Sequence, residues 1–421
     1  MRYGLIGKSL PHSFSPEIHK ALGNSDYVIR ELAPSALPEF IKQKEYIGLN
    51  VTIPYKQDVI PLLDEIDAPS RAIGAVNTIH NKDGRLYGYN TDYIGFSRLL
   101  KENEITLKGK SILILGTGGT SKTVRAVCQN EGATTIHRVS RRGKTPDAPE
   151  DEQDLISYDE ATSEFSDTQI IINTTPSGMY PDVDCQPITL DSFGQLEAVA
   201  DVIYNPLTTK LVLDARKRGI KAVNGLAMLV YQAEAAEEIW GVDLSGGKSG
   251  VVVARQMALD KRNLVLIGMP GSGKSTIGKL VAKSLGRELV DTDQFIEQKA
   301  GRSIPSIFAK EGETYFRDLE SEVCRDLMTR TGLIISTGGG LILRDENVDA
   351  LRINGTIVYL NRDIEKIIAG NSRPLAKSPE DIKRLYDNRH EKYEAAADVT
   401  VKVEGTPAQT AKETEDAFTN H

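Results

Sequence analysis

The chain of 421 residues contains only three cysteines and one tryptophan, and it has no long hydrophobic run. Cys128, Cys185 and Cys324 lie far apart, without metal-ligand spacing, which argues against a disulfide framework or a zinc site. No apolar stretch approaches the roughly 18 residues that a membrane-spanning helix needs. Pro11 and Pro16 interrupt the N-terminal stretch early, unlike a secretion signal. We therefore expect a cytoplasmic protein with buried thiols and no membrane partner.

Basic residues are in the minority. The chain has 51 lysines and arginines against 59 aspartates and glutamates, for a net charge of −8. This balance argues against a nucleic-acid partner, although a local basic pocket for an anionic ligand stays possible. The length predicts roughly two or three domains. Low-complexity tracts, long linkers and short repeats are lacking, and the sequence leaves open whether the protein is a monomer or a homodimer.

The most specific motif is a glycine-rich loop at residues 268–276, Gly-Met-Pro-Gly-Ser-Gly-Lys-Ser-Thr. It follows an apolar strand, Asn263–Ile267, and precedes a helix predicted over residues 277–285. Strand, glycine-rich turn and helix form the required context of a phosphate-binding loop, in which backbone N–H groups point at phosphate oxygens. Lys274 is expected to reach the outer phosphates of ATP, and the Ser275 hydroxyl to hold Mg²⁺. The ATP-binding residues predicted here are Gly271, Ser272, Gly273, Lys274, Ser275 and Thr276.

The first quarter of the chain places several polar residues at the ends of predicted elements. Ser13 and Ser15 stand just before a helix that Pro16 opens, a position suited to a carboxylate, although such serines more often only cap a helix. Pro54 ends a strand and leaves Lys56 at its mouth. A hairpin turning at residues 81–84 is predicted to bring Asn77 near Thr91 and Asp92.

The second quarter predicts a dinucleotide-binding fold. A buried strand over residues 110–115 leads into Gly116-Thr-Gly-Gly-Thr-Ser121 and then into a helix. This is G-x-G-G-x-S, so Ser121 replaces the third glycine of the usual fingerprint. The next strand ends at Ser140-Arg141-Arg142. An acidic residue is usual there in NAD-binding folds, whereas arginines suit the 2′-phosphate of NADP. The alternative is a solvated basic loop.

The motifs SxS, NVTIPYK, GAVNT and GYNTD, in this order, resemble shikimate dehydrogenase over residues 1–258. The resemblance implies that Ser13 and Ser15 hold the substrate carboxylate. It places Thr52, Lys56, Asn77, Asp92 and Gln232 around the ring hydroxyls and the reacting carbonyl. Lys56 and Asp92 are then the catalytic pair, with the proton donor left open between them. Around NADP(H) it implies Gly116, Gly118, Gly119, Thr120, Ser121, Ser140, Arg141, Arg142, Tyr204, Gly225 and Met228. Helical spacing alone would instead predict that Met228 packs in the hydrophobic core. The family commonly has Asn-Arg-Thr where this chain has Ser140-Arg141-Arg142.

In the last third of the chain, a strand is predicted over residues 289–293, ending in Asp291 and Asp293. This part, about residues 262–421, resembles shikimate kinase through DTD, GExxFRxxE, STGGG and RPL after the phosphate loop. The resemblance implies that Asp291 and Ser275 hold the metal, and that Arg373 belongs to a lid that closes over ATP. The shikimate-binding residues it implies are Asp293, Arg317, Gly339, Gly340 and Arg389. By helical spacing alone, Arg389 would be one charge on the solvated face of a helix at residues 381–397. Asp293 is then the residue that accepts the hydroxyl proton. The strand at residues 333–337 carries no second metal-binding aspartate, and residues 367–372 lack the arginine that some relatives have.

The predicted fold is α/β throughout. We expect a substrate-binding domain at residues 1–101, completed by helices at 225–258, a Rossmann-like NADP domain at 105–224, and a P-loop kinase domain, similar to nucleoside monophosphate kinases, at 262–421. The predicted function is bifunctional: NADPH reduces 3-dehydroshikimate to shikimate, which ATP then phosphorylates. Two alternatives stay open, an NAD-using quinate/shikimate dehydrogenase fused to the kinase, and a ligand-sensing module without turnover in one half.

Overall fold

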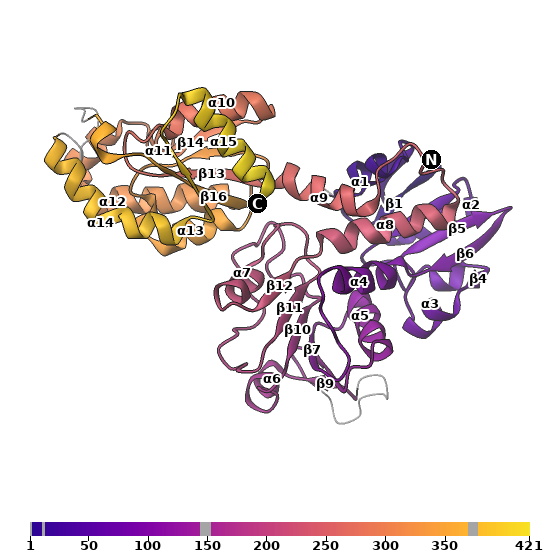
Figure 1. Ribbon diagram of the computed structural model, residues 1–421. Helices are drawn as coiled ribbons and strands as arrows, with labels where there is room; N and C mark the ends of the chain where they lie inside the picture. The colour runs from indigo at the N-terminus through magenta and orange to yellow at the C-terminus, as the bar shows by residue number, and fades with distance from the viewer. Residues whose placement is uncertain (1, 11–12, 144–152, 369–377) are drawn as a thin grey trace. The chain divides into compact units, whose positions relative to one another are not determined.

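Three β-sheets organise the chain, and each is built from segments that are close together in sequence. The computed structural model describes residues 2–10, 13–143, 153–368 and 378–421. The chain divides into two compact units, one of Met1–Asn205 with Thr209–Ala258 and one of Pro206–Thr208 with Leu259–His421. Figure 1 follows the chain through both. The predicted α/β class is confirmed.

The N-terminal sheet is mixed, with strand order β2-β1-β3-β5-β6-β4. The strands β1, β2 and β3 are parallel, whereas β5 runs antiparallel to both β3 and β6. The predicted hairpin is confirmed. Its turn is Asp83-Gly84, and both residues have the positive φ that such a two-residue turn needs. The elements are β1 (Tyr3–Gly7), α1 (Ser15–Leu22), β2 (Tyr27–Glu31), α2 (Leu37–Gln43), β3 (Gly48–Val51), β4 (Glu65–Ile66), α3 (Ala68–Ile73), β5 (Thr78–Lys82) and β6 (Arg85–Tyr89).

The second sheet is parallel, in the order β12-β11-β10-β7-β8-β9. Strand β7 lies between β8 and β10, so the strand order reverses there. Open parallel sheets bind their cofactor in the crevice at such a point, beyond the carboxyl ends of the strands. The elements are β7 (Ser111–Leu115), α5 (Gly119–Asn130), β8 (Thr135–Val139), β9 (Leu155–Ile156), α6 (Tyr158–Ser163), β10 (Ile170–Asn173), β11 (Ala198–Asp201), α7 (Lys210–Lys217) and β12 (Lys221–Val223).

Three further helices accompany the first two sheets: α4 (Thr91–Glu102), α8 (Leu226–Trp240) and α9 (Gly250–Lys261). Helices α4 and α8 pack closely because Gly95 lacks a side chain: a Cβ there would lie 2.6 Å from the carbonyl oxygen of Met228. This contact brings the start of α4, which carries Asp92, beside the face of α8 that carries Gln232. Trp240 at the end of α8 donates its indole N–H to the carbonyl of Ile79, which ties α8 to the first sheet.

The third sheet is parallel and has the order β14-β15-β13-β16-β17. Strand β13, which leads into the phosphate loop, is central. Figure 1 shows α10 and α15 side by side on one face of this sheet. The elements are β13 (Asn263–Ile267), α10 (Lys274–Leu285), β14 (Leu289–Asp291), α11 (Thr292–Ala300), α12 (Ile304–Leu327), β15 (Ile334–Ser336), α13 (Asp345–Arg352), β16 (Gly355–Asn361), α14 (Pro379–Ala396), β17 (Val399–Lys402) and α15 (Pro407–Asn420).

Four local predictions were wrong. Helix α10 begins at Lys274, three residues earlier than predicted, so Lys274 stands on its first turn. Asp293 lies in the first turn of α11 and not on a strand, because Asp291 already caps that helix. Ser15 is the first residue of α1, and Phe14 occupies the cap position without a side-chain bond. Cys185 is exposed, while the other two thiols are buried as predicted. Within the described residues, no helix is both long and apolar enough to cross a membrane.

Candidate active sites

The first candidate site is built around an ion pair. The ammonium of Lys56 donates to Asp92 Oδ2 at 2.6 Å, and the two side chains are only 13% and 12% exposed. Lys56 follows the end of β3, and Asp92 lies in the first turn of α4, where the helix dipole favours a carboxylate. A cation and an anion held in direct contact and mostly shielded from solvent can position a substrate oxygen and relay a proton to it.

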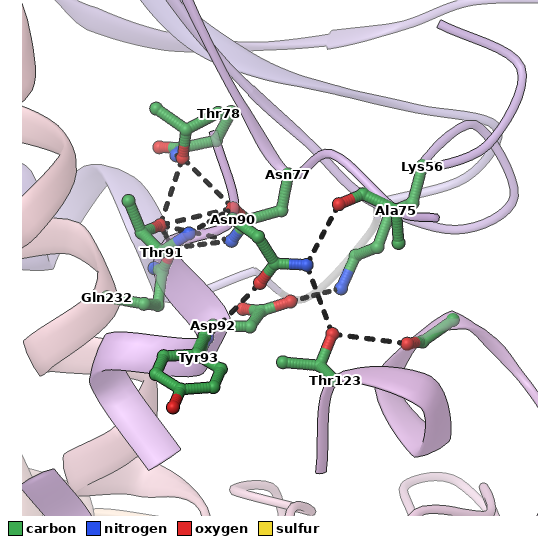
Figure 2. A network of polar contacts seen from close by, with 12 residues as sticks. Lys56, Ala75, Asn77, Thr78, Asn90, Thr91, Asp92, Tyr93, Thr123 and Gln232 are labelled. Atoms are coloured by element: carbon green, nitrogen blue, oxygen red, sulfur yellow. Dashed lines mark hydrogen bonds and ion pairs between the residues drawn. The ribbon is translucent and has the colours of Figure 1, made fainter. Parts of the chain in front are cut away.

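A cluster of amide and hydroxyl groups adjoins this pair (Figure 2). Asn77 accepts from the backbone N–H of Thr91 at 2.7 Å and donates to Thr91 Oγ1 at 3.1 Å. Gln232 Oε1 accepts from Asn77 Nδ2 at 3.4 Å and from Thr91 Oγ1 at 3.3 Å. The structure therefore brings Asn77 and Gln232 together, 155 residues apart in the chain. Gln232 also donates to the carbonyl of Leu229 at 2.8 Å, which leaves its second amide hydrogen for a ligand hydroxyl group.

Ser13, Ser15 and Thr52 lie at neighbouring strand and helix ends. Ser13 donates to Ser15 Oγ at 3.1 Å, and its oxygen accepts from the backbone N–H of Ser15 at 3.3 Å. Thr52 directly follows β3, and a Cβ on Gly7 would lie 2.8 Å from its methyl group. The ring of Phe14 packs on Tyr204, with centroids 5.2 Å apart, so the serine segment reaches the cofactor side of the unit.

The cofactor turn approaches Lys56 closely. A Cβ on Gly119 would lie 3.7 Å from Lys56 Cδ. Gly116 has a φ of +107°, and a Cβ there would lie 2.9 Å from Thr174 Oγ1, so this position favours glycine. Ser121 is fully buried and donates to the carbonyl of Gly116 at 2.7 Å, which closes the turn where the usual fingerprint has a third glycine. Gly118 and Thr120 stand at the N-terminal end of α5, where free N–H groups suit a pyrophosphate.

The remaining predicted cofactor residues lie at the carboxyl ends of the second sheet or on α8. Arg141 and Arg142 are exposed just beyond β8, and Ser140 Oγ accepts from the N–H of Gly143 at 3.0 Å. Gly225 precedes α8 and passes so close to Val202 that a Cβ would lie 2.0 Å from its carbonyl oxygen. Met228 belongs to a buried hydrophobic cluster.

Two residues of this unit that the motifs did not single out hold the site together. Asn90 donates to the carbonyl of Ala75 at 3.0 Å and to Thr123 Oγ1 at 3.1 Å, and so links the segment before β5 to helix α5 (Figure 2). Asp201 at the end of β11 accepts from Asn173 Nδ2 and Thr209 Oγ1. Burial raises the pKa of Asp201 to about 6. Asn90 stands inside the quoted GYNTD motif and Asp201 ends an apolar strand, but only their spatial neighbours identify these roles.

The second candidate site surrounds the phosphate loop. Lys274 is 8% exposed and donates to the carbonyls of Gly268 and Met269, at 2.8 and 3.0 Å, which holds the loop in its curled form. Ser275 Oγ donates to Asp291 Oδ2 at 2.8 Å. A hydroxyl and a carboxylate at this separation are hard oxygen donors of the kind that Mg²⁺ takes beside nucleotide phosphates. Asp291 Oδ1 accepts from the backbone N–H of Asp293, which orients the Asp291 carboxylate.

The carboxylates of Asp293 and Glu320 each place one buried oxygen beside Gly338. A Cβ on Gly338 would lie 2.5 Å from Asp293 Oδ1 and 3.1 Å from Glu320 Oε1. Burial, with repulsion from Asp291, raises the pKa of Asp293 to about 6. Burial also raises the pKa of Glu320 to about 7, although Arg317 opposes this shift. Both oxygens facing Gly338 lack a hydrogen-bond donor in the described part of the chain, so they are available to ligand hydroxyl groups.

Two arginines stand beside these carboxylates. Arg317 donates to Glu313 Oε1 and to Glu320 Oε2, and a Cβ on Gly340 would collide with its guanidinium. Arg389 is 5% exposed and donates to the carbonyl of Gly339 at 2.8 Å. Its helix face is therefore not solvated, contrary to the interpretation from helical spacing alone. The phosphate loop, Asp293 and both arginines line one cavity of about 520 Å³.

The same cavity is lined by residues that the sequence motifs did not predict as ligands, including Glu297, Phe308, Phe316, Glu320, Gly338 and Arg362. Glu320 was part of the quoted GExxFRxxE motif, and Gly338 is the first glycine of STGGG. Arg362 had no motif at all. Arg373, predicted in a lid over ATP, lies outside the described residues.

Two known families match parts of this chain. The family model described as shikimate dehydrogenase substrate binding domain matches residues 5–79, and the one described as shikimate kinase matches residues 270–418. A shikimate dehydrogenase (NADP⁺) of Clostridium beijerinckii is 42% identical over 247 residues, which cover 56% of this chain and 91% of that protein.

Two solved structures resemble the dehydrogenase part. A chorismate mutase/shikimate 5-dehydrogenase fusion protein from Clostridium acetobutylicum is 38% identical with a TM-score of 0.55, covering 61% of this chain and 94% of the other. A shikimate 5-dehydrogenase from Thermus thermophilus, in complex with NADP(H) and shikimate, is 30% identical with a TM-score of 0.53, covering 61% and 99%. The chain therefore belongs to the shikimate dehydrogenase family through its N-terminal part and carries a shikimate kinase domain in its C-terminal part.

Proposed function

We propose that the chain catalyses two consecutive steps of the shikimate pathway, the reduction of 3-dehydroshikimate by NADPH and the phosphorylation of the resulting shikimate by ATP. The observation that carries the proposal is the coexistence of two complete polar sites, one with the Lys56–Asp92 pair beside a dinucleotide turn and one with Lys274 and Asp293 lining the same cavity. The product of the first reaction is the substrate of the second, which gives a reason for both on one chain.

In the reductase site, NADPH supplies a hydride to the carbonyl carbon, and the carbonyl oxygen needs a proton. Lys56 and Asp92 together are proposed to hold that oxygen and deliver the proton. Asn77 and Gln232, already joined by a hydrogen bond, are proposed to bind ring hydroxyls, and Ser13 and Ser15 the carboxylate. The closed turn at Gly116 fits a pyrophosphate, since its backbone leaves no room for a side chain.

In the kinase site, the chain's own residues are proposed to position and neutralise charge. Arg317 and Arg389 bind the shikimate carboxylate. Asp293 accepts the proton of the attacking hydroxyl as the phosphoryl group transfers from ATP. Lys274 would exchange the loop carbonyls for the outer phosphates of ATP. Ser275 and Asp291 would hold Mg²⁺, which would supply positive charge against the phosphates. The raised pKa of Asp293, about 6, makes it a better base than an ordinary aspartate while leaving it mostly ionised at pH 7.

Separate assays of the full chain test the proposal. The first follows NADPH oxidation with 3-dehydroshikimate, and the second follows ADP release from ATP with shikimate, with the phosphorylated product identified by mass spectrometry. Both reactions should proceed. Equal efficiency with NADH, or oxidation of quinate, would replace the proposed first activity by the quinate/shikimate alternative. Binding without turnover in either assay would show a ligand-sensing role for that half.

A further inference from the structure

Arg362 lies beside the phosphate loop but belongs to a different segment. It directly follows β16, which pairs with β13 in a register that sets Tyr359 opposite Ile267. One residue further along each strand, a Cβ on Gly268 would lie 2.8 Å from the carbonyl oxygen of Leu360. The end of β16 therefore runs along the start of the loop. Arg362 lines the same cavity as Lys274 and the loop glycines.

The other cations lining this cavity are already engaged. Lys274 donates to two loop carbonyls, Arg317 to two glutamates, and Arg389 to Gly339. By contrast, the Nε of Arg362 is buried and has no acceptor within the described part of the structure. The Arg362 side chain is partly buried, and a buried donor atom without a partner costs free energy. Because this one borders a cavity, a ligand there can supply the missing acceptor.

The neighbours of Arg362 indicate the chemistry of that acceptor. A guanidinium presents several N–H donors in one plane and matches the oxygens of a phosphate group. The substrate carboxylate already has Arg317 and Arg389, whereas residues 367–372, Ile-Ile-Ala-Gly-Asn-Ser, supply no cation before Arg373. We propose that Arg362 is a nucleotide-binding residue that contacts the phosphate chain of ATP. This inference rests on the proposed kinase function.

The test compares Arg362→Gln with Arg384→Gln, which removes an exposed arginine paired to Asp381 on the same domain. Calorimetric titration with ADP should show an affinity about 10-fold or more lower in Arg362→Gln, since a charge-assisted hydrogen bond is lost. The KM for ATP should rise similarly and the KM for shikimate should stay unchanged. Inhibition by adenosine, which lacks phosphates, should also be unchanged. Arg384→Gln should match the unmodified protein in every measurement.

Thermal melting separates this role from a structural one. Because Arg362→Gln removes an unpaired buried donor, its melting temperature should stay equal or rise while ADP affinity falls. A lower melting temperature with unchanged ADP affinity would overturn the inference, as would an effect on adenosine equal to that on ADP, or a change in the KM for shikimate alone. If the unmodified chain bound no ADP, the proposed kinase function itself would be wrong.

Discussion

Asn90, which precedes α4, is hydrogen-bonded to Thr123 on α5, with Nδ2 3.1 Å from Oγ1. Asn90 also caps α4, two residues before Asp92. Thr123 lies on α5, just after the turn proposed to hold the cofactor, and donates to the carbonyl of Gly119 at 3.2 Å. One buried contact therefore connects the helix that carries Asp92 to the helix after the proposed cofactor turn. It offers a way to test whether the relative position of the two matters for reduction.

Thr123→Val keeps the shape of the side chain and removes the acceptor for Asn90. We expect kcat/KM for NADPH to fall about 5- to 10-fold, in line with the loss of one buried hydrogen bond, while kinase activity is unchanged. Thr162→Val is the matched control, because that threonine bonds only to backbone carbonyls of its own helix α6 among the contacts described. Equal losses in both variants would mean that Thr123 acts on stability alone.

The cofactor preference should depend on Arg141 and Arg142. Both are exposed beyond β8, and a glutamate there would repel a 2′-phosphate and favour ribose hydroxyls. We expect Arg142→Glu or Arg141→Glu to raise the KM for NADPH at least about 10-fold, because a charge-assisted contact becomes repulsive. The KM for NADH should change little. Equal use of NADPH and NADH by the unmodified protein would contradict the prediction.

The two activities should be separable by single substitutions. Lys56→Ala breaks the ion pair with Asp92 and should abolish reduction without affecting phosphorylation. Arg317→Ala should do the reverse, because it removes a cation from the kinase cavity. Both assays are run on each purified variant, with circular dichroism as the check on folding. Loss of both activities from one folded variant would show that the sites are not independent.

The parts of both sites that lie close together in sequence were predictable. The phosphate loop follows its strand directly, and the strand-to-helix turn at Gly116 needs only local residues, so periodicity and turn chemistry located both. The sequence also showed that Ser121 stands where the usual fingerprint has its third glycine. It did not show that Ser121 donates a hydrogen bond to the Gly116 carbonyl. That bond depends on how the turn closes, which residue types do not determine.

The parts that depend on distant packing were not predictable. Arg389 is buried because α14 packs over Gly339, 50 residues earlier in the chain. Asn90 and Thr123 are neighbours only because two separate sheets meet there. Arg362 follows an apolar strand as an ordinary polar residue, and only the pairing of β16 with β13 brings it to the phosphate loop. Helical or strand periodicity predicts which face of its own element a residue lies on. The roles of these residues instead depend on contacts with elements that are distant in the sequence.

Kinase activity should fall on the acidic side of pH 6. The carboxyl of Asp293 has its pKa raised to about 6 by burial and by Asp291. As a proton acceptor it works only when ionised, so lowering the pH through this value should reduce kcat/KM about 10-fold per unit once the group is mostly protonated. Reduction by the same samples controls for unfolding. A kinase profile that stays flat to about pH 5 would exclude Asp293 as the base. Asp293→Asn should abolish phosphorylation at every pH.

We expect the kinase to need glycine at position 338 because a larger side chain would collide with its neighbours, and not because the backbone there needs a positive φ. Gly338 is absent from the described glycines with positive φ, so alanine fits its backbone. A Cβ, however, would lie 2.5 Å from Asp293 Oδ1 and 3.1 Å from Glu320 Oε1, and both of these oxygens are buried. Gly338→Ala must therefore displace Asp293, and displacements of about 1 Å in an active site can reduce rates about 100-fold.

We expect Gly338→Ala to lower kcat/KM for shikimate by about that 100-fold factor, with the KM for ATP nearly unchanged because the phosphate loop is not touched. Gly194→Ala is the control, since a Cβ there meets nothing within 4 Å. Reduction of 3-dehydroshikimate by the same protein should match the unmodified chain. Full kinase activity in Gly338→Ala would show that Asp293 can move without loss, and so that its position beside Gly338 does not determine proton transfer.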